Sequence, residues 1–99
     1  MDIAYSVNGV PIRLTHERWY HITENHDELA SYFYEVLETV ENPVLVVRGN
    51  HGTLKAAKSV GRNKWLTVIY REVARNDGFV ITAYFLPKRP RGDIIWQRH

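Results

Sequence analysis

The spacing of hydrophobic residues changes once along the chain, near Asn42-Pro43. After this point apolar and polar residues alternate, which is the period of a strand. Before it, apolar residues recur every three or four positions, as in an amphipathic helix, at Leu29, Tyr32, Phe33, Val36, Leu37 and Val40. Helices that precede a group of strands are typical of the α+β class, so we expect an α+β fold.

A first, short helix is predicted over residues 16–24. Thr15 is a favourable N-cap because its hydroxyl can accept a hydrogen bond from a free backbone N–H of the first turn. Trp19 and Ile22 lie three positions apart, so they share one face. We expect that face to point into the core.

A second helix is predicted to begin at Asn25. Asn25 and Glu28, three residues later, resemble a capping box, in which two side chains satisfy free backbone N–H groups. The helix is expected to end at Asn42, because the residue before a proline is disfavoured in the helical conformation.

Four strands are predicted in the second half, over residues 44–48, 53–60, 65–73 and 79–86. The connections GNHG, GRNK and ARNDG are rich in turn residues. Short connections favour antiparallel pairing of consecutive strands. The sequence therefore predicts a four-stranded antiparallel meander.

An N-terminal β-hairpin is predicted from residues 4–7 and 10–14, which flank Asn8-Gly9. This dipeptide favours a two-residue type I′ turn, with positive φ at both positions. Pro11 cannot donate to a ladder, so its strand is expected at a sheet edge.

The 99 residues are expected to form a single domain, because a chain of this length builds only one core. It divides into a hairpin (1–14), two helices (15–42), a sheet (44–87) and a basic and apolar tail (88–99). Ile94, Ile95 and Trp96 are expected to dock the tail on the body.

The composition excludes several classes of protein. With no cysteine there are no disulfides, thiolate chemistry or cysteine-type zinc sites. The N-terminal residues, with Asp2, resemble neither a signal peptide nor a membrane anchor, and no run approaches the roughly 20 apolar residues of a spanning helix. We expect a cytoplasmic protein without a membrane partner.

Charge is divided unevenly between the two halves. Residues 1–41 hold eight carboxylates and two arginines, a net charge of −6, whereas residues 42–99 hold eleven cations and three carboxylates, a net charge of +8. A basic half can collect phosphates and release their counterions. The alternative is that the two halves form salt bridges across the domain.

Three histidines, His16, His21 and His26, are spaced five residues apart. Imidazoles that share a metal on one helix need a spacing of three or four, whereas a spacing of five turns the side chains about 140° apart. No metal site or other cofactor is therefore expected. His21, between Trp19 and Ile22, is the better candidate for proton transfer, which requires a group that titrates near neutral pH.

Several polar residues lie within the predicted strands. Arg71 and Lys58 are mid-strand cations that would stabilise a phosphate in a nucleic-acid enzyme, or would form ion pairs with helix glutamates. Thr82 faces either Arg71 or Glu72, because a shift of one residue in the register reverses the choice. Further candidate contacts for RNA are Lys55, Tyr84, Lys88 and Arg89.

The runs RWYHITENHDELASYFYEVLETVENPVLVV and KWLTVIYREVARNDGFVITAYF resemble the small nuclease domains grouped with barnase, EndoU, colicin toxins and RelE, known as the BECR fold. The resemblance is to the phage-type and cyanobacterial-type members and covers about residues 18–86. It depends on the order of W-x-H-I, H-x-E, the proline after the helix, and the final DGF-x-ITAY strand. The chain departs from the pattern at Asp27, where relatives often have proline.

This resemblance implies a metal-independent endoribonuclease, the toxin of a toxin–antitoxin pair. The ribose 2′-hydroxyl attacks the adjacent phosphate and leaves a 2′,3′-cyclic phosphate. The RNA is expected to be tRNA or mRNA, and the partner a small antitoxin protein. By position, the implied catalytic residues are His21 first and His26 second for proton transfer, Arg71 and Lys58 for charge stabilisation, Thr82 for positioning, Glu72 as a base or orienting group, and Tyr84 for stacking.

Two other functions remain open at this point. The same basic sheet would serve a non-catalytic RNA-binding or protein-interaction module. A nuclease-derived subunit without activity is the third possibility. Cleavage that persists in a chelator favours the enzyme, and salt-sensitive binding of intact RNA favours the binding module.

Overall fold

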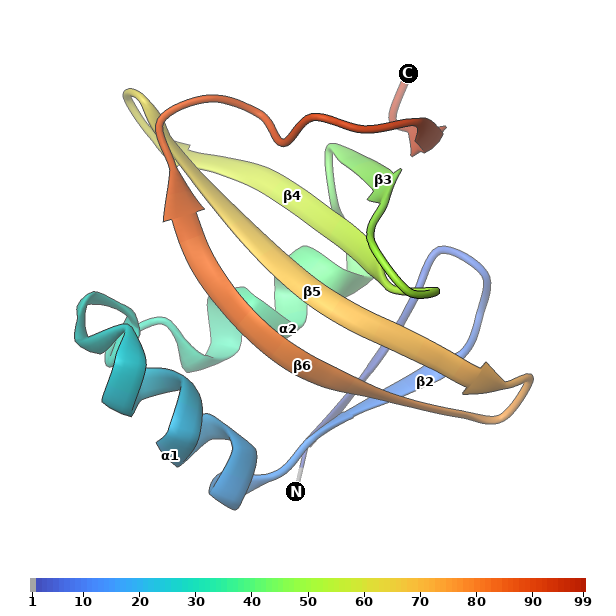
Figure 1. The fold of residues 1–99 in the computed structure, drawn as a ribbon, viewed down its shortest axis with the longest axis horizontal. Coiled ribbons are helices and arrows are strands. Elements are labelled where there is room, and N and C mark those ends of the chain that lie inside the picture. Colours follow the sequence, from blue (N-terminus) through green and yellow to red (C-terminus); the bar gives the residue numbers. More distant parts are fainter. Residues whose placement is uncertain (1) are drawn as a thin grey trace.

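The computed structural model describes residues 2–99 as two helices packed on one face of a seven-stranded sheet (Figure 1). The strand order is β1-β2-β6-β5-β4-β3-β7. The elements are β1 (Asp2–Tyr5), β2 (Pro11–Leu14), α1 (His16–Asn25), the 3₁₀ turn η1 (Asp27–Leu29), α2 (Phe33–Glu41), β3 (Leu45–Arg48), β4 (Leu54–Gly61), β5 (Lys64–Ala74), β6 (Asp77–Leu86) and β7 (Ile94–Gln97). We call the face without helices the outer face.

The structure is α+β with two helices, but the prediction of a four-stranded antiparallel meander is wrong. The four predicted strands are present as β3 to β6 and pair antiparallel in consecutive order. However, β2 pairs with β6 in parallel, through Ile12 with Gly78 and Arg13 with Phe79. Strand β1 pairs antiparallel with β2 and so also joins the sheet. At the other edge β7 pairs with β3. These partners are far apart in sequence, so short connections gave no sign of them.

The predicted geometry of the N-terminal hairpin is also wrong. Only Gly9 has positive φ, at +78°, and the turn closes with a hydrogen bond from the Gly9 N–H to the Ser6 carbonyl (2.8 Å). Strand β2 has neighbours on both sides, so Pro11 does not lie on an edge strand. It is the first residue of β2, a position where a missing N–H is also tolerated.

The helices confirm one predicted cap and contradict the other. Thr15 Oγ1 accepts a hydrogen bond from the Arg18 N–H at 3.0 Å, as expected of the N-cap of α1. Asn25 starts no helix: it is the last residue of α1, and its Nδ2 donates to the His21 carbonyl at 3.1 Å. The α2 helix begins only at Phe33, after η1.

The main core lies between α2 and the sheet. Val36 and Val40 of α2 are fully buried against β5 residues Leu66, Val68 and Tyr70. The sheet curves around α2 so that both edges approach its C-terminal end. There Glu41 accepts a hydrogen bond from the Tyr5 N–H, and Asn42 accepts one from Arg98. No helix among residues 2–99 is long and apolar enough to cross a membrane.

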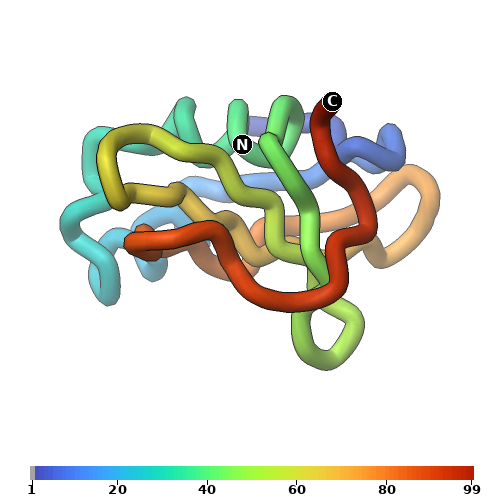
Figure 2. The backbone as a smooth tube through the Cα atoms, turned by 90° about the horizontal axis from the view of Figure 1, so that it is seen from above, coloured from blue at the N-terminus to red at the C-terminus, as the bar shows by residue number. Residues whose placement is uncertain are grey.

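The tail crosses the outer face before it forms β7. A small second cluster lies on this face, formed by Leu45, Val47 and Ala57 with Val44 and Trp65. The Arg89 guanidinium lies 5.4 Å from the centre of the Trp65 ring. Trp96 packs on the main core, whereas Ile94 and Ile95 are exposed. The tail and the turn around residue 50 both project on the side away from α2 (Figure 2).

Gly78→Ala is expected to lower the free energy of unfolding by about 1–3 kcal/mol, because overpacking of a closed site strains its neighbours. A Cβ at Gly78 would lie 2.5 Å from Ile12 Cδ1 and 2.6 Å from the Arg71 carbonyl oxygen. The matched control is Gly61→Ala, whose Cβ meets nothing closer than Lys64 Cβ at 3.8 Å. Urea unfolding of the two variants measures the difference, and equal stabilities would contradict the assigned contact between β2, β5 and β6.

Candidate functional site

The two faces of β5 carry different residues. Leu66, Val68 and Tyr70 point into the main core, so the alternate residues, including Thr67 and Arg71, point to the outer face. Directly opposite residues of paired strands share a face. Ile69 pairs with Thr82 and Thr67 with Tyr84, so Thr82 and Tyr84 also lie on the outer face. Of the two residues considered from the sequence, Arg71 rather than Glu72 shares a face with Thr82.

Thr82 and Lys55 lie on either side of Ile69 in the middle of the outer face. Lys55 of β4 pairs with Ile69, and Thr82 of β6 pairs with it from the other side. Tyr84 and Arg71 each lie two positions further along their strands, in opposite directions, at about 7 Å from this centre. The face therefore carries two cations and two hydroxyl groups around one apolar residue.

Arg71 and Lys55 have no acidic partner. Among residues 2–99 no carboxylate oxygen lies within 4.0 Å of either side chain. Arg71 Nη1 instead lies 3.1 Å from the position that a Cβ on Gly52 would occupy. Gly52 has a φ of +77°, so a glycine is favoured here both by the backbone and by the approach of the guanidinium. Both positive charges are thus available to an anion.

The hydroxyl groups of the face differ in their surroundings. Thr67 is fully buried between Ala57 and Tyr84, and its Oγ1 has no hydrogen-bond partner among the described residues. Burial raises the pKa of Tyr84 above its ordinary value. A tyrosine phenol is already protonated at neutral pH with its ordinary pKa of about 10, so Tyr84 can donate a hydrogen bond.

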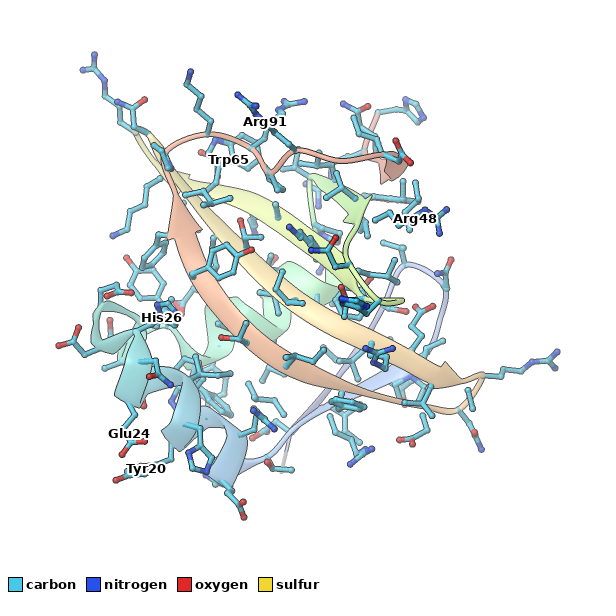
Figure 3. The ribbon with its side chains drawn as sticks, viewed as in Figure 1. Tyr20, Glu24, His26, Arg48, Trp65 and Arg91 are labelled. Carbon is cyan, nitrogen blue, oxygen red and sulfur yellow. The ribbon has the colours of Figure 1, made fainter. Side chains whose placement is uncertain are left out.

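His26 lies at the rim of the outer face. It is the C-cap residue of α1, and its ring centre is 6.2 Å from that of Tyr84. His26 Nδ1 is 3.5 Å from a Glu28 carboxylate oxygen, and about a third of its side chain (35%) is exposed. Figure 3 shows His26 between α1 and β6. This histidine is thus partly exposed to solvent and lies beside Tyr84.

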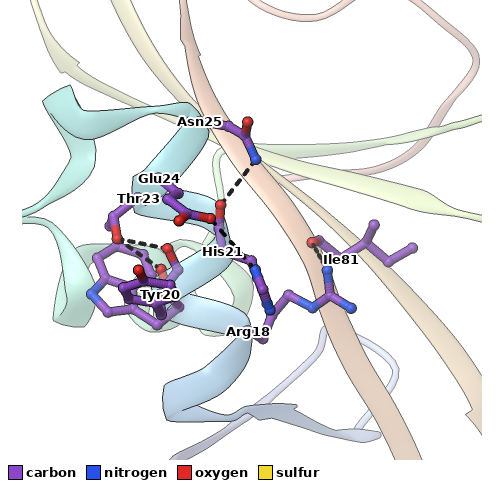
Figure 4. Close-up of polar contacts among 8 residues, drawn as sticks. Arg18, Tyr20, His21, Thr23, Glu24, Asn25 and Ile81 are labelled. Carbon is purple, nitrogen blue, oxygen red and sulfur yellow. Dashed lines mark hydrogen bonds and ion pairs between the residues drawn. The ribbon is translucent and has the colours of Figure 1, made fainter.

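His21 lies on α1, next to the part of β6 that extends beyond its two pairs with β2 (Figure 4). Its Nδ1 is 3.7 Å from Glu24 Oε1, and 52% of the side chain is exposed. The neighbouring Arg18 donates from Nη1 to the Ile81 carbonyl at 3.4 Å (Figure 4). His21 has no hydrogen bond or ring contact with the residues of the outer face that the structure describes. The geometry therefore favours His26 over His21.

Lys58 and Glu72 lie on the other side of the sheet from Arg71. Lys58 pairs with Leu66 of the core face and forms an ion pair with Glu38 of α2, which is the structural alternative considered from the sequence. Glu72 accepts hydrogen bonds from the Ser6 hydroxyl (2.5 Å) and from Asn8 Nδ2 (3.1 Å). The two side chains hold α2 and the first turn against the sheet.

The tail supplies cations at one end of the outer face. Arg89 covers Trp65, and Lys88 is exposed. Figure 3 shows Arg91 and Trp65 at this same end of the sheet. Lys88 and Arg89 are thus separated from Arg71 by most of the length of β5.

Four residues of interest escaped the sequence analysis: Thr67, His51, Arg13 and Arg18. Thr67 resembles any β-forming residue, and only its pairing opposite Tyr84 distinguishes it. His51 lies in the turn against which Arg71 packs and has a positive φ of 56°. The sequence does distinguish the two arginines, because Arg13 and Arg18 are the only lysine or arginine residues in the acidic segment 1–41.

Tyr70→Phe is expected to raise the free energy of unfolding by about 1 kcal/mol at neutral pH. The Tyr70 hydroxyl is buried and unpartnered among the described residues, and an unsatisfied polar group costs free energy. Burial first, and the nearby Glu72 carboxylate second, raise the pKa of Tyr70 well above its ordinary 10.0.

Tyr70→Phe should also lose less stability than the parent protein as the pH rises above 10. In the unfolded chain the Tyr70 phenol loses its proton near pH 10, whereas in the folded protein the phenol stays protonated to higher pH. The free energy of unfolding therefore keeps its full value below pH 10 and falls as the pH rises above 10. Urea unfolding at about pH 8 and about pH 11 measures this difference. A variant with the same alkaline loss as the parent would contradict the burial of a protonated phenol.

Residues 2–99 form no metal site, and a groove in the surface lies apart from the candidate residues. No group of three or more His, Asp or Glu side chains within residues 2–99 is arranged to hold a metal ion. A groove of about 680 Å³ lies away from the outer face, along β7 and the end of α2, and is lined by Trp96, Gln97 and Glu41 among others. It brings together none of the candidate residues predicted from the sequence.

Comparisons with known proteins add no relative. No family model matches the chain, and no curated protein or solved structure is significantly similar to it. The function is therefore inferred from the side chains of the outer face together with the sequence pattern.

Proposed function

We propose that this protein is a metal-independent endoribonuclease that cleaves RNA on the outer face of its sheet. One observation carries the proposal: two cations without acidic partners, Arg71 and Lys55, share this face with Thr82 and Tyr84, and His26 lies at its rim. Transfer of a phosphoryl group needs positive charge at the phosphate and a group that accepts a proton.

In the proposed reaction the scissile phosphate lies over Thr82 and Ile69, between His26 on one side and Arg71 on the other. Neutral His26 accepts the proton of the ribose 2′-hydroxyl, and the 2′-oxygen forms a bond to phosphorus. The bond to the 5′-oxygen breaks, and this oxygen takes a proton from solvent. The products are a 2′,3′-cyclic phosphate and a free 5′-hydroxyl.

Charge builds up on the non-bridging oxygens as the 2′-oxygen attacks. Arg71 and Lys55 stabilise this charge, and the Thr82 and Tyr84 hydroxyls donate hydrogen bonds to the same oxygens. The Tyr84 phenol is protonated at neutral pH, as this role requires. Exposed Lys88 and Arg89 of the tail contribute further attraction for the RNA backbone.

The biological role that we propose is that of a cytoplasmic toxin acting on tRNA or mRNA and restrained by a small antitoxin protein. Support for this part comes from the sequence resemblance alone. It is tested by expressing the chain from a tightly repressed promoter with and without the protein encoded beside it, and following growth and RNA integrity.

The reaction is tested with purified protein and a labelled single-stranded RNA in the presence of a chelator. We expect cleavage with a 2′,3′-cyclic phosphate end, and no cleavage of the matched oligonucleotide with 2′-deoxyribose throughout. Loss of cleavage in the chelator would exclude the metal-independent reaction. Salt-sensitive binding with intact RNA would instead support the non-catalytic binding module.

Two lysines of β4 offer a matched test of which face is used. Lys55→Gln is expected to lower the cleavage rate by about tenfold or more, because it removes an unpaired charge from the outer face. Lys58→Gln should leave the rate of the folded protein unchanged, because Lys58 pairs with Glu38 on the helix side. Initial rates of both variants measure the difference, and a greater loss in Lys58→Gln would refute the assignment of the outer face.

A further inference from the structure

A small cavity lies where β2 and β6 separate. The two strands pair only at Ile12 with Gly78 and Arg13 with Phe79, after which the chain leaves the sheet to enter α1. The cavity has a volume of about 180 Å³ and is lined by Arg13, Thr15, Arg18, Phe79 and Val80. This volume is well below that of a typical small-molecule site, which is about 300 Å³ or more. The cavity therefore has room for only one compact chemical group.

The polar lining of this cavity consists of hydrogen-bond donors. Arg13 and Arg18 are the only cations among the first 41 residues, and both line it, while no carboxylate does. Arg13 uses Nε to bind Asp77 at 2.9 Å, which leaves its two Nη groups free of this ion pair. Arg18 has no carboxylate within 4.0 Å among residues 2–99, so its charge is not neutralised by a direct partner.

The hydroxyl group of Thr15 also favours the binding of an anion in this cavity. Thr15 Oγ1 accepts a hydrogen bond from the Arg18 N–H, so its own hydrogen is free to be donated. Arg18 is oriented by its bond to the Ile81 carbonyl at the free edge of β6 (Figure 4). Two arginines and a threonine thus line one small space, and guanidinium and hydroxyl groups match the oxygens of a phosphate.

The cavity opens close to the proposed reaction centre. Phe79 pairs with Arg71, so it lies on the outer face, and Thr82 follows Phe79 and Val80 on the same strand. Two to three residues of strand separate the cavity from Thr82, which is about 7–10 Å. This separation is too great for one phosphate to contact both Thr82 and the cavity.

We propose that the cavity formed by Arg13, Thr15 and Arg18 binds a second phosphate of the same RNA strand, next to the phosphate at which the strand is cleaved. The inference rests on the proposed function and adds that the enzyme holds at least two phosphates of a single strand along β6. A substrate with only one internal phosphate would leave the cavity empty. Longer single-stranded RNA should therefore be preferred over a dinucleotide.

The probe for this site is a single-stranded oligonucleotide with 2′-O-methyl groups throughout, which the proposed reaction cannot cleave. Its dissociation constant is measured over a range of salt concentrations for the parent, Arg18→Gln and the control Arg62→Gln. Arg62 is an exposed cation of the turn between β4 and β5, away from the cavity. Arg18→Gln should bind more weakly, and the slope of log K against log salt should decrease in magnitude by about 0.7, the loss of one phosphate contact.

Arg62→Gln should leave the slope unchanged. Arg13→Gln is a second variant, with circular dichroism to check folding, and should reproduce the effect of Arg18→Gln. Equal slopes for the parent and both cavity variants would overturn the proposal even if the protein cleaves RNA. A reduced slope in a protein that cleaves no RNA would support the phosphate site and refute the ribonuclease, so the two failures are distinguishable.

Discussion

Replacing His26 with alanine is expected to slow RNA cleavage by about 10²-fold to 10⁴-fold without unfolding the protein. The proposed role of His26 is to accept the proton of the 2′-hydroxyl. Its ring lies beside Tyr84 of the outer face, and a third of the side chain is exposed to solvent. The measurement is the single-turnover rate on a short RNA, with thermal unfolding to confirm that the variant is folded.

His21→Ala is the matched control for His26→Ala. His21 also lies on α1 and pairs with a glutamate, but it contacts no residue of the outer face that the structure describes. Its replacement should change the rate by less than about tenfold. A larger loss in His21→Ala than in His26→Ala would restore the order of preference expected from the sequence and would contradict the geometric argument.

Arg71→Gln is expected to lower the cleavage rate by about 10²-fold to 10³-fold, the usual cost of removing one group that stabilises transition-state charge. The guanidinium has no acidic partner within residues 2–99 and packs against the turn at Gly52. Its removal therefore breaks no ion pair of the fold. The substrate concentration for half-maximal rate should change less than the maximal rate, because the interaction is stronger in the transition state.

Glu72→Gln is the control next to Arg71 in sequence but on the opposite face. Glu72 holds Ser6 and Asn8 of the first turn, so its replacement should lower the free energy of unfolding by about 1–3 kcal/mol. The rate per folded molecule should stay close to that of the parent. If Glu72→Gln abolished cleavage in a folded protein and Arg71→Gln did not, the assignment of the two faces to catalysis and structure would be wrong.

The local pattern of the sequence was sufficient for the elements themselves. The change of hydrophobic period at residue 42 predicted helices followed by strands, and Thr15 predicted the start of α1. The same patterns predicted all four central strands and their antiparallel order. These features depend on interactions between near neighbours in the chain, such as a cap or a short turn, and such interactions can be read residue by residue.

Capping chemistry alone misassigned the start of the second helix. Asn25 has the residue type of an N-cap, and Glu28 lies at the expected spacing, yet Asn25 ends α1 and bonds to His21. Leu29 is fully buried in the 3₁₀ turn, and Phe33 packs on the core from the start of α2. The helix boundary therefore follows the burial of these residues rather than the cap, since tertiary packing outweighs a local preference of about 1 kcal/mol.

The sequence by itself determined which side chains were available for chemistry, and only the tertiary structure decided which of them meet. The parallel pairing of β2 with β6 depends on residues more than sixty positions apart, and it creates the Arg13 and Arg18 cavity. The register of β5 on β6 decides that Thr82 faces Arg71 rather than Glu72. A shift of one residue would reverse every face, and this register is set by long-range packing that no local pattern records.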